Sequence, residues 1–250
     1  MKYAHQFLVT TVSLIAIVPL LTVPAGAGEI HGKQTGQNVS LGSGSFASNT
    51  SGKHNTALGH RALRLNTIGK KNTALGRIAL RHNTRGNNNT AVGSEALWKN
   101  TRGHQNTALG VQALNQNTTG RYNTASGYLA LTYNTTGRNN TASGYAALYK
   151  NTTGDNNTAV GVYAGGNNTT GNNNVFIGYL AGYNSTNQSY KLIIANGGTS
   201  NNELITGDFS AHTVQINGDL HAKGSVSTSD GRLKKDIKPL THALDSILQL

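Results

Sequence analysis

The chain has 250 residues, a formal net charge of +12 with histidine neutral, and only 36% hydrophobic residues. It contains no cysteine, which excludes a disulfide framework and thiolate metal sites. Its 31 glycines and its Asn- and Thr-rich middle are atypical of a globular core, so stability has to come from stacked repeats.

The N-terminal segment, residues 1–27, reads as a secretory signal. Lys2 is followed by an apolar stretch over 7–23 and by the small residues Ala25-Gly26-Ala27, which fit a signal peptidase. An uncleaved membrane anchor is the alternative, but the apolar run is shorter than the roughly 20 residues that a span needs. We therefore expect a secreted or cell-surface protein with no transmembrane segment after signal removal, and a short linker over 28–37.

The motif Asn-Thr-Ala-x-Gly recurs through the middle of the chain at a constant step of 17 residues. Degenerate copies begin at Asn38 and Asn174, which gives nine registers without an insertion. A repeat of this length predicts a solenoid, and we assign residues 38–190 to an all-β parallel roll. The full copies begin at Asn55, Asn72, Asn89, Asn106, Asn123, Asn140 and Asn157.

Each unit contains two short apolar segments and two turn signals. The first segment is Thr-Ala-Leu, as in 56–58, and the second is Ala-Leu, ending at Leu63, followed by Asn-Thr-x-Gly, as in 66–69. Because recurrent glycine opposes a helix and permits positive φ, we expect two short strands and two tight turns per coil. Positions two and four, Thr56 and Leu58, share a strand face that we expect to point inward. The Leu63 column is either a second interior row or a seam between chains.

A single column of Ala and Leu is thin for a free monomer, which favours an oligomer. The surface charge is uneven: from Lys53 to Arg102 there are ten Lys or Arg residues and one acid, Glu95. An exposed basic stripe would attract anionic polymers such as acidic glycans, lipid phosphates or nucleic acid, although a net charge identifies no specific nucleic acid. The alternative is a solvated surface that keeps a low-complexity fibre soluble.

Two further surface features leave alternatives open. Columns of Asn and Thr, beginning with Asn66-Thr67, could match an ice or crystalline-glycan lattice, or could be turn formers that bond the backbone. Many Asn-x-Thr triplets match glycosylation acceptors, although the repeat itself generates them. Tyrosines that could stack on sugars or cover seams between coils gather late in the roll, at Tyr128, Tyr145, Tyr149, Tyr163, Tyr179 and Tyr183.

The small-apolar-Gly units of residues 38–190 resemble the β-roll repeats of trimeric autotransporter adhesin heads. This resemblance implies a left-handed roll and three chains side by side, hence a homotrimer that displays an adhesive surface to a cell-surface ligand. The present coils differ in their greater length and in their Asn-Thr-rich turns.

After the roll, residues 191–196, 204–209 and 214–220 read as strands separated by glycine turns. We expect them to form a β-connector over 191–227.

The run Ser229-Asp230-Gly231-Arg232-Leu233-Lys234 and the following Pro239-Leu240 resemble the start of the endosialidase-type intramolecular chaperone domain of trimeric tail spikes. The resemblance implies that the domain assists trimer assembly and then cuts itself off, with Ser229 as nucleophile and Lys234 as base, between Thr228 and Ser229. A Ser hydroxyl needs such a base. An ordinary basic linker is the alternative.

The residues 228–250 cover only the beginning of that domain, including a short helix over 241–250, where apolar residues recur at helical spacing. We therefore expect no cleavage in the 250-residue chain.

The sequence favours a secreted trimeric fibre, adhesin-like and self-processed. The alternatives are a prophage-derived tail fibre, against which the signal segment argues, and a glycan- or ice-binding solenoid. An enzyme with an external substrate is disfavoured, because the roll's two acids, Glu95 and Asp155, lie coils apart and its histidines lack ligand spacing. At most we expect serine autoprotease activity, with no metal site and no cofactor.

Overall fold

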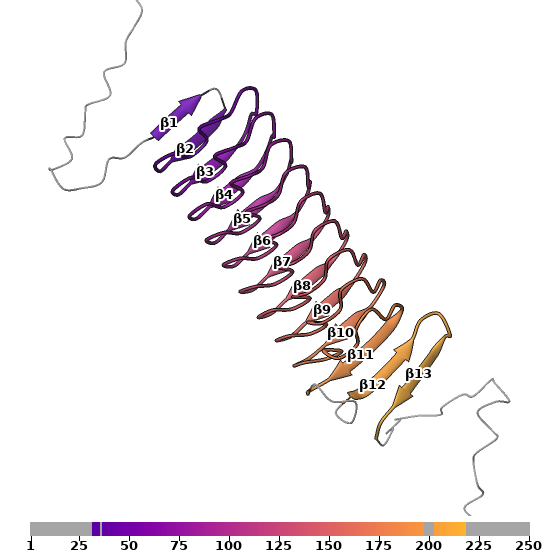
Figure 1. Ribbon diagram of the computed structural model, residues 1–250. Coiled ribbons are helices and arrows are strands. Elements are labelled where there is room, and N and C mark those ends of the chain that lie inside the picture. Colours follow the sequence, from indigo (N-terminus) through magenta and orange to yellow (C-terminus); the bar gives the residue numbers. More distant parts are fainter. Residues whose placement is uncertain (1–31, 36, 198–202, 219–250) are drawn as a thin grey trace, which may run out of the picture.

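A computed structural model describes residues 32–35, 37–197 and 203–218, and every regular element within them is a β-strand. The strands form one sheet in sequence order, and Figure 1 shows them side by side. They are β1 (Gly32–Thr35), β2 (Asn38–Leu41), β3 (Thr56–Leu58), β4 (Thr73–Leu75), β5 (Thr90–Val92), β6 (Thr107–Leu109), β7 (Thr124–Ser126), β8 (Thr141–Ser143), β9 (Thr158–Val160), β10 (Val175–Ile177), β11 (Lys191–Ala195), β12 (Glu203–Asp208) and β13 (Thr213–Ile216).

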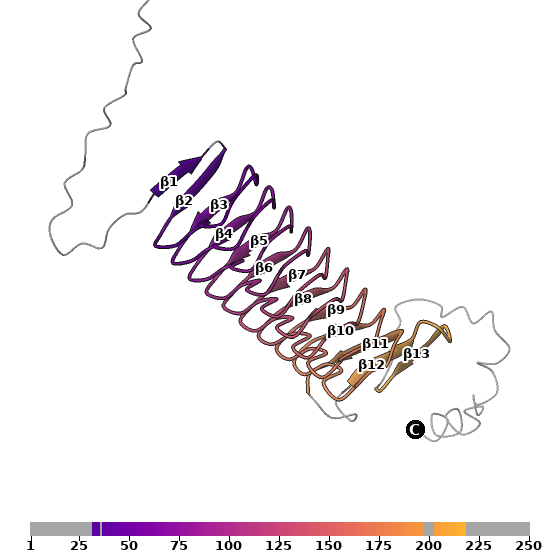
Figure 2. The same cartoon turned by 45° about the horizontal axis from the view of Figure 1, so that its top comes forward.

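The strands β2 to β10 pair in parallel. Each strand residue pairs with the residue 17 positions further along the chain, as Thr73 does with Thr90. The predicted parallel roll is therefore confirmed, and Figure 2 shows its coils stacked along one axis. Strand β11 extends the parallel ladder by one rung, whereas β12 and β13 are antiparallel to their neighbours. The strands expected after residue 190 are thus present, and at the other end β1 is antiparallel to β2.

The strand face that points inward is the opposite of the one expected. Ala74, at position three of its motif, is fully buried, whereas Thr73 and Leu75 on either side are only half-buried. In each coil from β3 to β9 the alanine is buried, and its two neighbours are half-buried or exposed. Alanine is selected because the coil is narrow at this side, so the larger Leu and Val side chains have to project outward.

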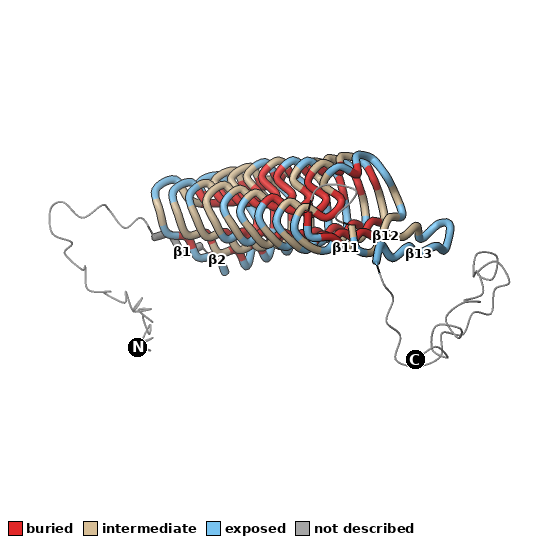
Figure 3. The backbone as a smooth tube through the Cα atoms, turned by 90° about the horizontal axis from the view of Figure 1, so that it is seen from below, coloured by how far each residue is buried: buried red, intermediate tan, exposed pale blue. Residues whose placement is uncertain are grey.

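The second apolar segment is not a strand, which corrects the expected two strands per coil. Leu63 and its equivalents up to Leu148 have φ between 48° and 52°, outside the β region. Such a conformation costs a non-glycine residue about 1–2 kcal/mol. Burial of the leucine side chain, which is fully enclosed in every one of these coils, contributes a similar amount. The leucine column is therefore an interior row and not a seam between chains. Figure 3 shows buried residues recurring along the roll.

Two columns of asparagine complete the interior. Asn106 donates its side-chain amide to Asn89 Oδ1 at 3.1 Å and to Gly120 O at 2.9 Å, while its own Oδ1 accepts the backbone N–H of Asn123. The second column, in the Asn-Thr-x-Gly turns, is also buried, and Asn117 donates to Asn100 Oδ1 at 2.8 Å. Buried polar groups are tolerated only when they are hydrogen-bonded, and these amide ladders meet that need coil after coil.

Glycine ends each strand because two coils approach closely there. Gly110 has a φ of 136°, and a Cβ on it would lie 2.4 Å from the carbonyl oxygen of Gly127 in the next coil. Gly76 and Gly93 are likewise on adjacent coils, as the 17-residue step predicts.

The last coils replace the Ala and Leu of the interior by a different pair. Phe176 stands in the alanine column, and Gly165 and Gly182 stand in the leucine column. A Cβ on Gly165 would lie 2.5 Å from the Phe176 ring, and one on Gly182 would lie 2.2 Å from it. One phenylalanine thus fills the space that leucines occupy elsewhere.

The predicted signal segment, the Ser229–Lys234 pair and the helix over 241–250 lie outside the described residues.

Candidate functional surfaces

The outward strand face carries two columns, one of threonine and one that is mostly apolar. Leu109 and Val160, in the apolar column, are 42% and 44% exposed, and Ser126 and Ser143 interrupt the column in the middle of the roll. Leu41, Val92, Leu109, Val160 and Ile177 are between 39% and 44% exposed, whereas Leu58 and Leu75 in the same column are half-buried. A flat row of this kind along one side of a narrow protein is typical of an interaction surface.

The basic residues of the first half do not form a single stripe. Because the step is constant, their columns follow from their position in the coil: Arg77 lies just after the strand, Arg85 in the Asn-Thr-x-Gly turn, and Lys70 just after that turn. Arg77 forms an ion pair with Glu95 at 2.7 Å, and this exposed pair contributes little to stability. Positive charge is therefore distributed around the coils.

The asparagine-threonine columns do not present a polar lattice. The asparagines are buried, and the threonine hydroxyls donate to the next coil, as Thr118 Oγ1 does to Thr135 O at 3.0 Å. The structure thus favours the turn-former interpretation. It also encloses the asparagines of the sequons that begin at Asn117 and Asn134, which supports their being products of the repeat.

Tyrosine rings form rows along the roll. Tyr128, Tyr145, Tyr163 and Tyr183 contact one another in series, with ring centroids 5.1–5.8 Å apart. A second pair, Tyr133 and Tyr149, is edge-to-face at 4.9 Å. Tyr133 was not among the tyrosines expected to matter, because its spacing of 16 residues from Tyr149 puts the two rings in neighbouring columns, and a 17-residue repeat does not align them.

A shallow groove of about 610 Å³ surrounds this second pair. Tyr149 is hydrogen-bonded to the Tyr133 side chain, and this bond, together with burial, raises the pKa of Tyr149 to about 12. The groove is lined by Gln116, Tyr133, Thr135, Tyr149, Lys150, Thr152 and Thr169.

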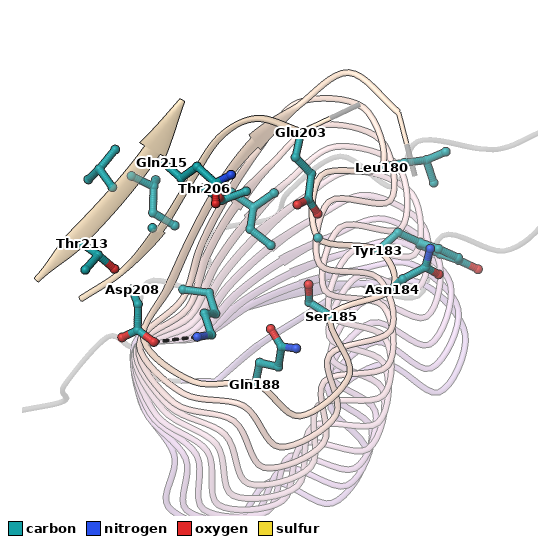
Figure 4. A pocket seen from close by; sticks show the side chains of 16 residues that line it. Leu180, Tyr183, Asn184, Ser185, Gln188, Glu203, Thr206, Asp208, Thr213 and Gln215 are labelled. Carbon is teal, nitrogen blue, oxygen red and sulfur yellow. Dashed lines mark hydrogen bonds and ion pairs between the residues drawn. The ribbon is translucent and has the colours of Figure 1, made fainter. Parts of the chain in front are cut away.

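A cavity of about 580 Å³ lies at the C-terminal end of the roll, where the sheet continues as β11–β13 beyond the last complete coil. Figure 4 shows the ion pair of Lys191 and Asp208 at its rim, at 2.6 Å. That contact holds the pKa of Asp208 well below its usual range, and burial raises the pKa of Glu203 in the wall. The nearby Oδ1 of Asn168 ends its amide ladder without a hydrogen-bond partner among the described residues. Ser185 occupies the next position of the Asn168 column, 17 residues further along the chain.

The described residues bring together no catalytic group of the kinds considered from the sequence. Glu95 bonds Arg77 and Gln112, and Asp155 accepts the backbone N–H of Arg138. No cluster of three or more His, Asp or Glu residues in the described ranges could hold a metal ion. Ser229 and Lys234, predicted to act in self-cleavage, fall beyond the described part of the chain.

Within the described ranges, no helix has the length and hydropathy required to cross a bilayer. Comparison with protein families, with curated proteins and with solved structures finds no match to this chain. The parallel β-solenoid therefore stands without assignment to a family.

Proposed function

We propose that this chain is a segment of a secreted, homotrimeric fibre of the adhesin type, in which the roll is the rigid display module. The observation that carries the proposal is the exposed apolar column on the strand face, from Leu41 to Ile177. Each coil has a small interior, so association through this face would remove from water a row of apolar side chains that is interrupted at Ser126 and Ser143. The signal-like segment 1–27 supports export, and the resemblance to adhesin heads supports a trimer.

Light scattering on a chain that begins at residue 28 tests the assembly. We expect a particle of about three times the mass of one chain, and we expect Leu109→Asp to shift it to monomer while the β-rich circular dichroism spectrum persists. Thr136→Asp, also exposed but in a turn, is the matched control and should remain trimeric. A wild-type chain that is folded and monomeric contradicts the proposal.

The processing part of the proposal rests on the sequence from Ser229 to Leu240. In a chain that continues through a complete chaperone domain, Ser229 attacks the bond after Thr228 and Lys234 accepts its proton. Mass spectrometry should find the cut in the wild type and an intact chain in Ser229→Ala and Lys234→Ala, both still assembled. Cleavage that persists in Ser229→Ala would exclude this mechanism.

A further inference from the structure

The two positions that follow each buried leucine vary more than the interior of the repeat. After Leu131 they are Thr132 and Tyr133, and after Leu148 they are Tyr149 and Lys150. The interior residues of these coils are Ala, Leu and Asn throughout. Most members of these pairs are half-buried or exposed, with Asn115 and Thr132 buried, so folding constrains this side of the coil less than it constrains the interior. In chain order the pairs are Arg64-Leu65, Arg81-His82, Trp98-Lys99, Asn115-Gln116, Thr132-Tyr133 and Tyr149-Lys150.

The groove on this edge combines aromatic surface with polar groups that can hold a hydroxylated ligand. Tyr133 is 44% exposed, and its ring and that of Tyr149 meet edge-to-face, which leaves apolar ring surface toward the groove. The hydroxyls of Thr135 and Thr152 already donate to backbone carbonyls, at 2.9 and 3.0 Å, so they remain available as acceptors. An apolar floor with a few polar groups is the composition of a ligand site.

Positive charge continues from the groove along the same edge. Lys150 lies in its wall, and no carboxylate in the described residues pairs with it. Toward the N-terminus, Lys99 follows in the column of Tyr133, and Arg102 and Arg85 follow in the adjoining turn column. All of these are exposed, whereas burial lowers the pKa of His82, so the charge comes from Lys and Arg.

We propose that this edge binds an acidic linear polysaccharide lying along the axis of the roll, with a sugar ring on Tyr133 and Tyr149. Its carboxylates or sulfates contact Lys150 on one side and Lys99 and Arg102 on the other. The inference deepens the proposed function, on which it rests for the role of the roll as a display module.

A sugar polymer fits the edge better than single-stranded nucleic acid does. Nucleic acid requires successive aromatic platforms on which successive bases stack. Here the two rings of the groove lie at 80° to each other, so they do not form a series of parallel platforms. Tyrosine also offers hydroxyls, and Gln116 an amide, for hydrogen bonds to sugar hydroxyls.

The edge remains free if chains associate through their strand faces. Tyr183 and Asn184 occupy the columns of Tyr149 and Tyr133 two and three coils further on. Figure 4 shows both side chains on the side of the roll away from the strands. Binding and assembly therefore use different sides and fail independently.

Calorimetric titration with an oligogalacturonate, a carboxylate-bearing linear sugar, tests the inference on the chain from residue 28. The methyl-esterified oligomer, a sulfated oligosaccharide and a single-stranded oligodeoxynucleotide are the comparison probes. We expect binding of the acidic sugars that weakens with salt, and weak binding of the ester. Tyr133→Ala/Tyr149→Ala should raise Kd about tenfold and Lys150→Ala about threefold.

The matched control is Tyr128→Ala/Tyr145→Ala, which removes another contacting pair of exposed rings and should leave Kd unchanged. Circular dichroism and light scattering on each variant show that fold and assembly persist. No binding of either acidic sugar by the folded wild type, or equal losses in both double variants, would overturn the proposal. Tighter binding of the oligodeoxynucleotide at the same residues would make the edge a nucleic-acid site and overturn it as well. A monomeric chain that still binds through Tyr133 and Tyr149 would contradict only the proposed assembly.

Discussion

The inside and the outside of the roll follow different rules. Inside, Ala, Leu and Asn recur in every coil from β3 to β8, and a change in one column is matched in another, as Phe176 is by Gly165 and Gly182. Outside, one half of the roll is basic and the other carries most of the tyrosines, with no change in the backbone step. The interior residues therefore determine the conformation of the coil, and the exterior residues are free to determine its binding partners.

The glycine column provides the largest expected difference between inside and outside. Gly110→Ala places a Cβ 2.4 Å from the Gly127 carbonyl at a φ of 136°, so we expect a loss of more than about 4 kcal/mol in the free energy of unfolding. Gly44, with a φ of 66° and its nearest neighbour at 3.4 Å, should accept asparagine with little change. Chemical denaturation measures both, and equal stability of the two variants would be inconsistent with tight coil contact.

In the last coils Phe176 fills the space of the leucine column, so a loss of stability at Phe176 should be recoverable by a leucine in that column. Phe176→Ala should lower stability by about 3–5 kcal/mol, because it leaves a cavity. Gly165 has a φ of 59°, near the 50° of Leu148, so Gly165→Leu added to Phe176→Ala should refill the space and recover part of the loss. Gly165→Leu alone should destabilise, since its side chain would meet the ring. Thermal melts of the three variants test this coupling between residues 165 and 176. If the double variant lost stability equal to the sum of the two single losses, the two sites would not be coupled.

The asparagine ladders should be sensitive to a single deletion. Asn106→Ala leaves the backbone N–H of Asn123 without its acceptor, while the Oδ1 of Asn89 keeps only the backbone N–H of residue 106, and we expect the change to cost about 3 kcal/mol. Asn139 is exposed and has a φ of 54°, a conformation that glycine adopts without strain. Asn139→Gly should therefore change the free energy of unfolding by less than about 0.5 kcal/mol. Denaturant midpoints separate the two, and a neutral Asn106→Ala would show that the ladder is dispensable.

The smallest effect is expected at the C-terminal end, where repetition stops. Lys191 depresses the pKa of Asp208, so the contact stabilises the folded state above the ordinary aspartate pKa and is lost as the pH falls through the depressed value. The protection of the β12 amides, taken relative to the intrinsic exchange rate at each pH, should therefore fall on acidification in the wild type and depend less on pH in Asp208→Asn. Identical pH profiles of the two proteins would show that the ion pair does not stabilise this end of the sheet.

The step of the repeat predicted the parallel ladder and the position of Gly76 beside Gly93, and the apolar runs between glycine turns predicted the strands after residue 190. The step did not predict everything in the coil. It did not predict which strand face is inside, because alternation alone leaves two choices and Thr-Ala-Leu has apolar residues on both. The small volume of alanine decides in its favour. The second segment was assigned to a strand because positive φ at Leu63 has no signature in a leucine side chain. The groove escaped notice because Tyr133 and Tyr149 lie in different columns.

In the proposed trimer, chains meet through the outward strand face, while the inward columns only hold each coil together. Since the chain has no cysteine, a single Leu109→Cys placed on that face reports contact between chains directly. Under mild oxidation we predict covalent dimers drawn from a trimer for Leu109→Cys, and uncrosslinked chains for Thr136→Cys. Chains that stay uncrosslinked at Leu109→Cys, or crosslink equally at both positions, would contradict the claim.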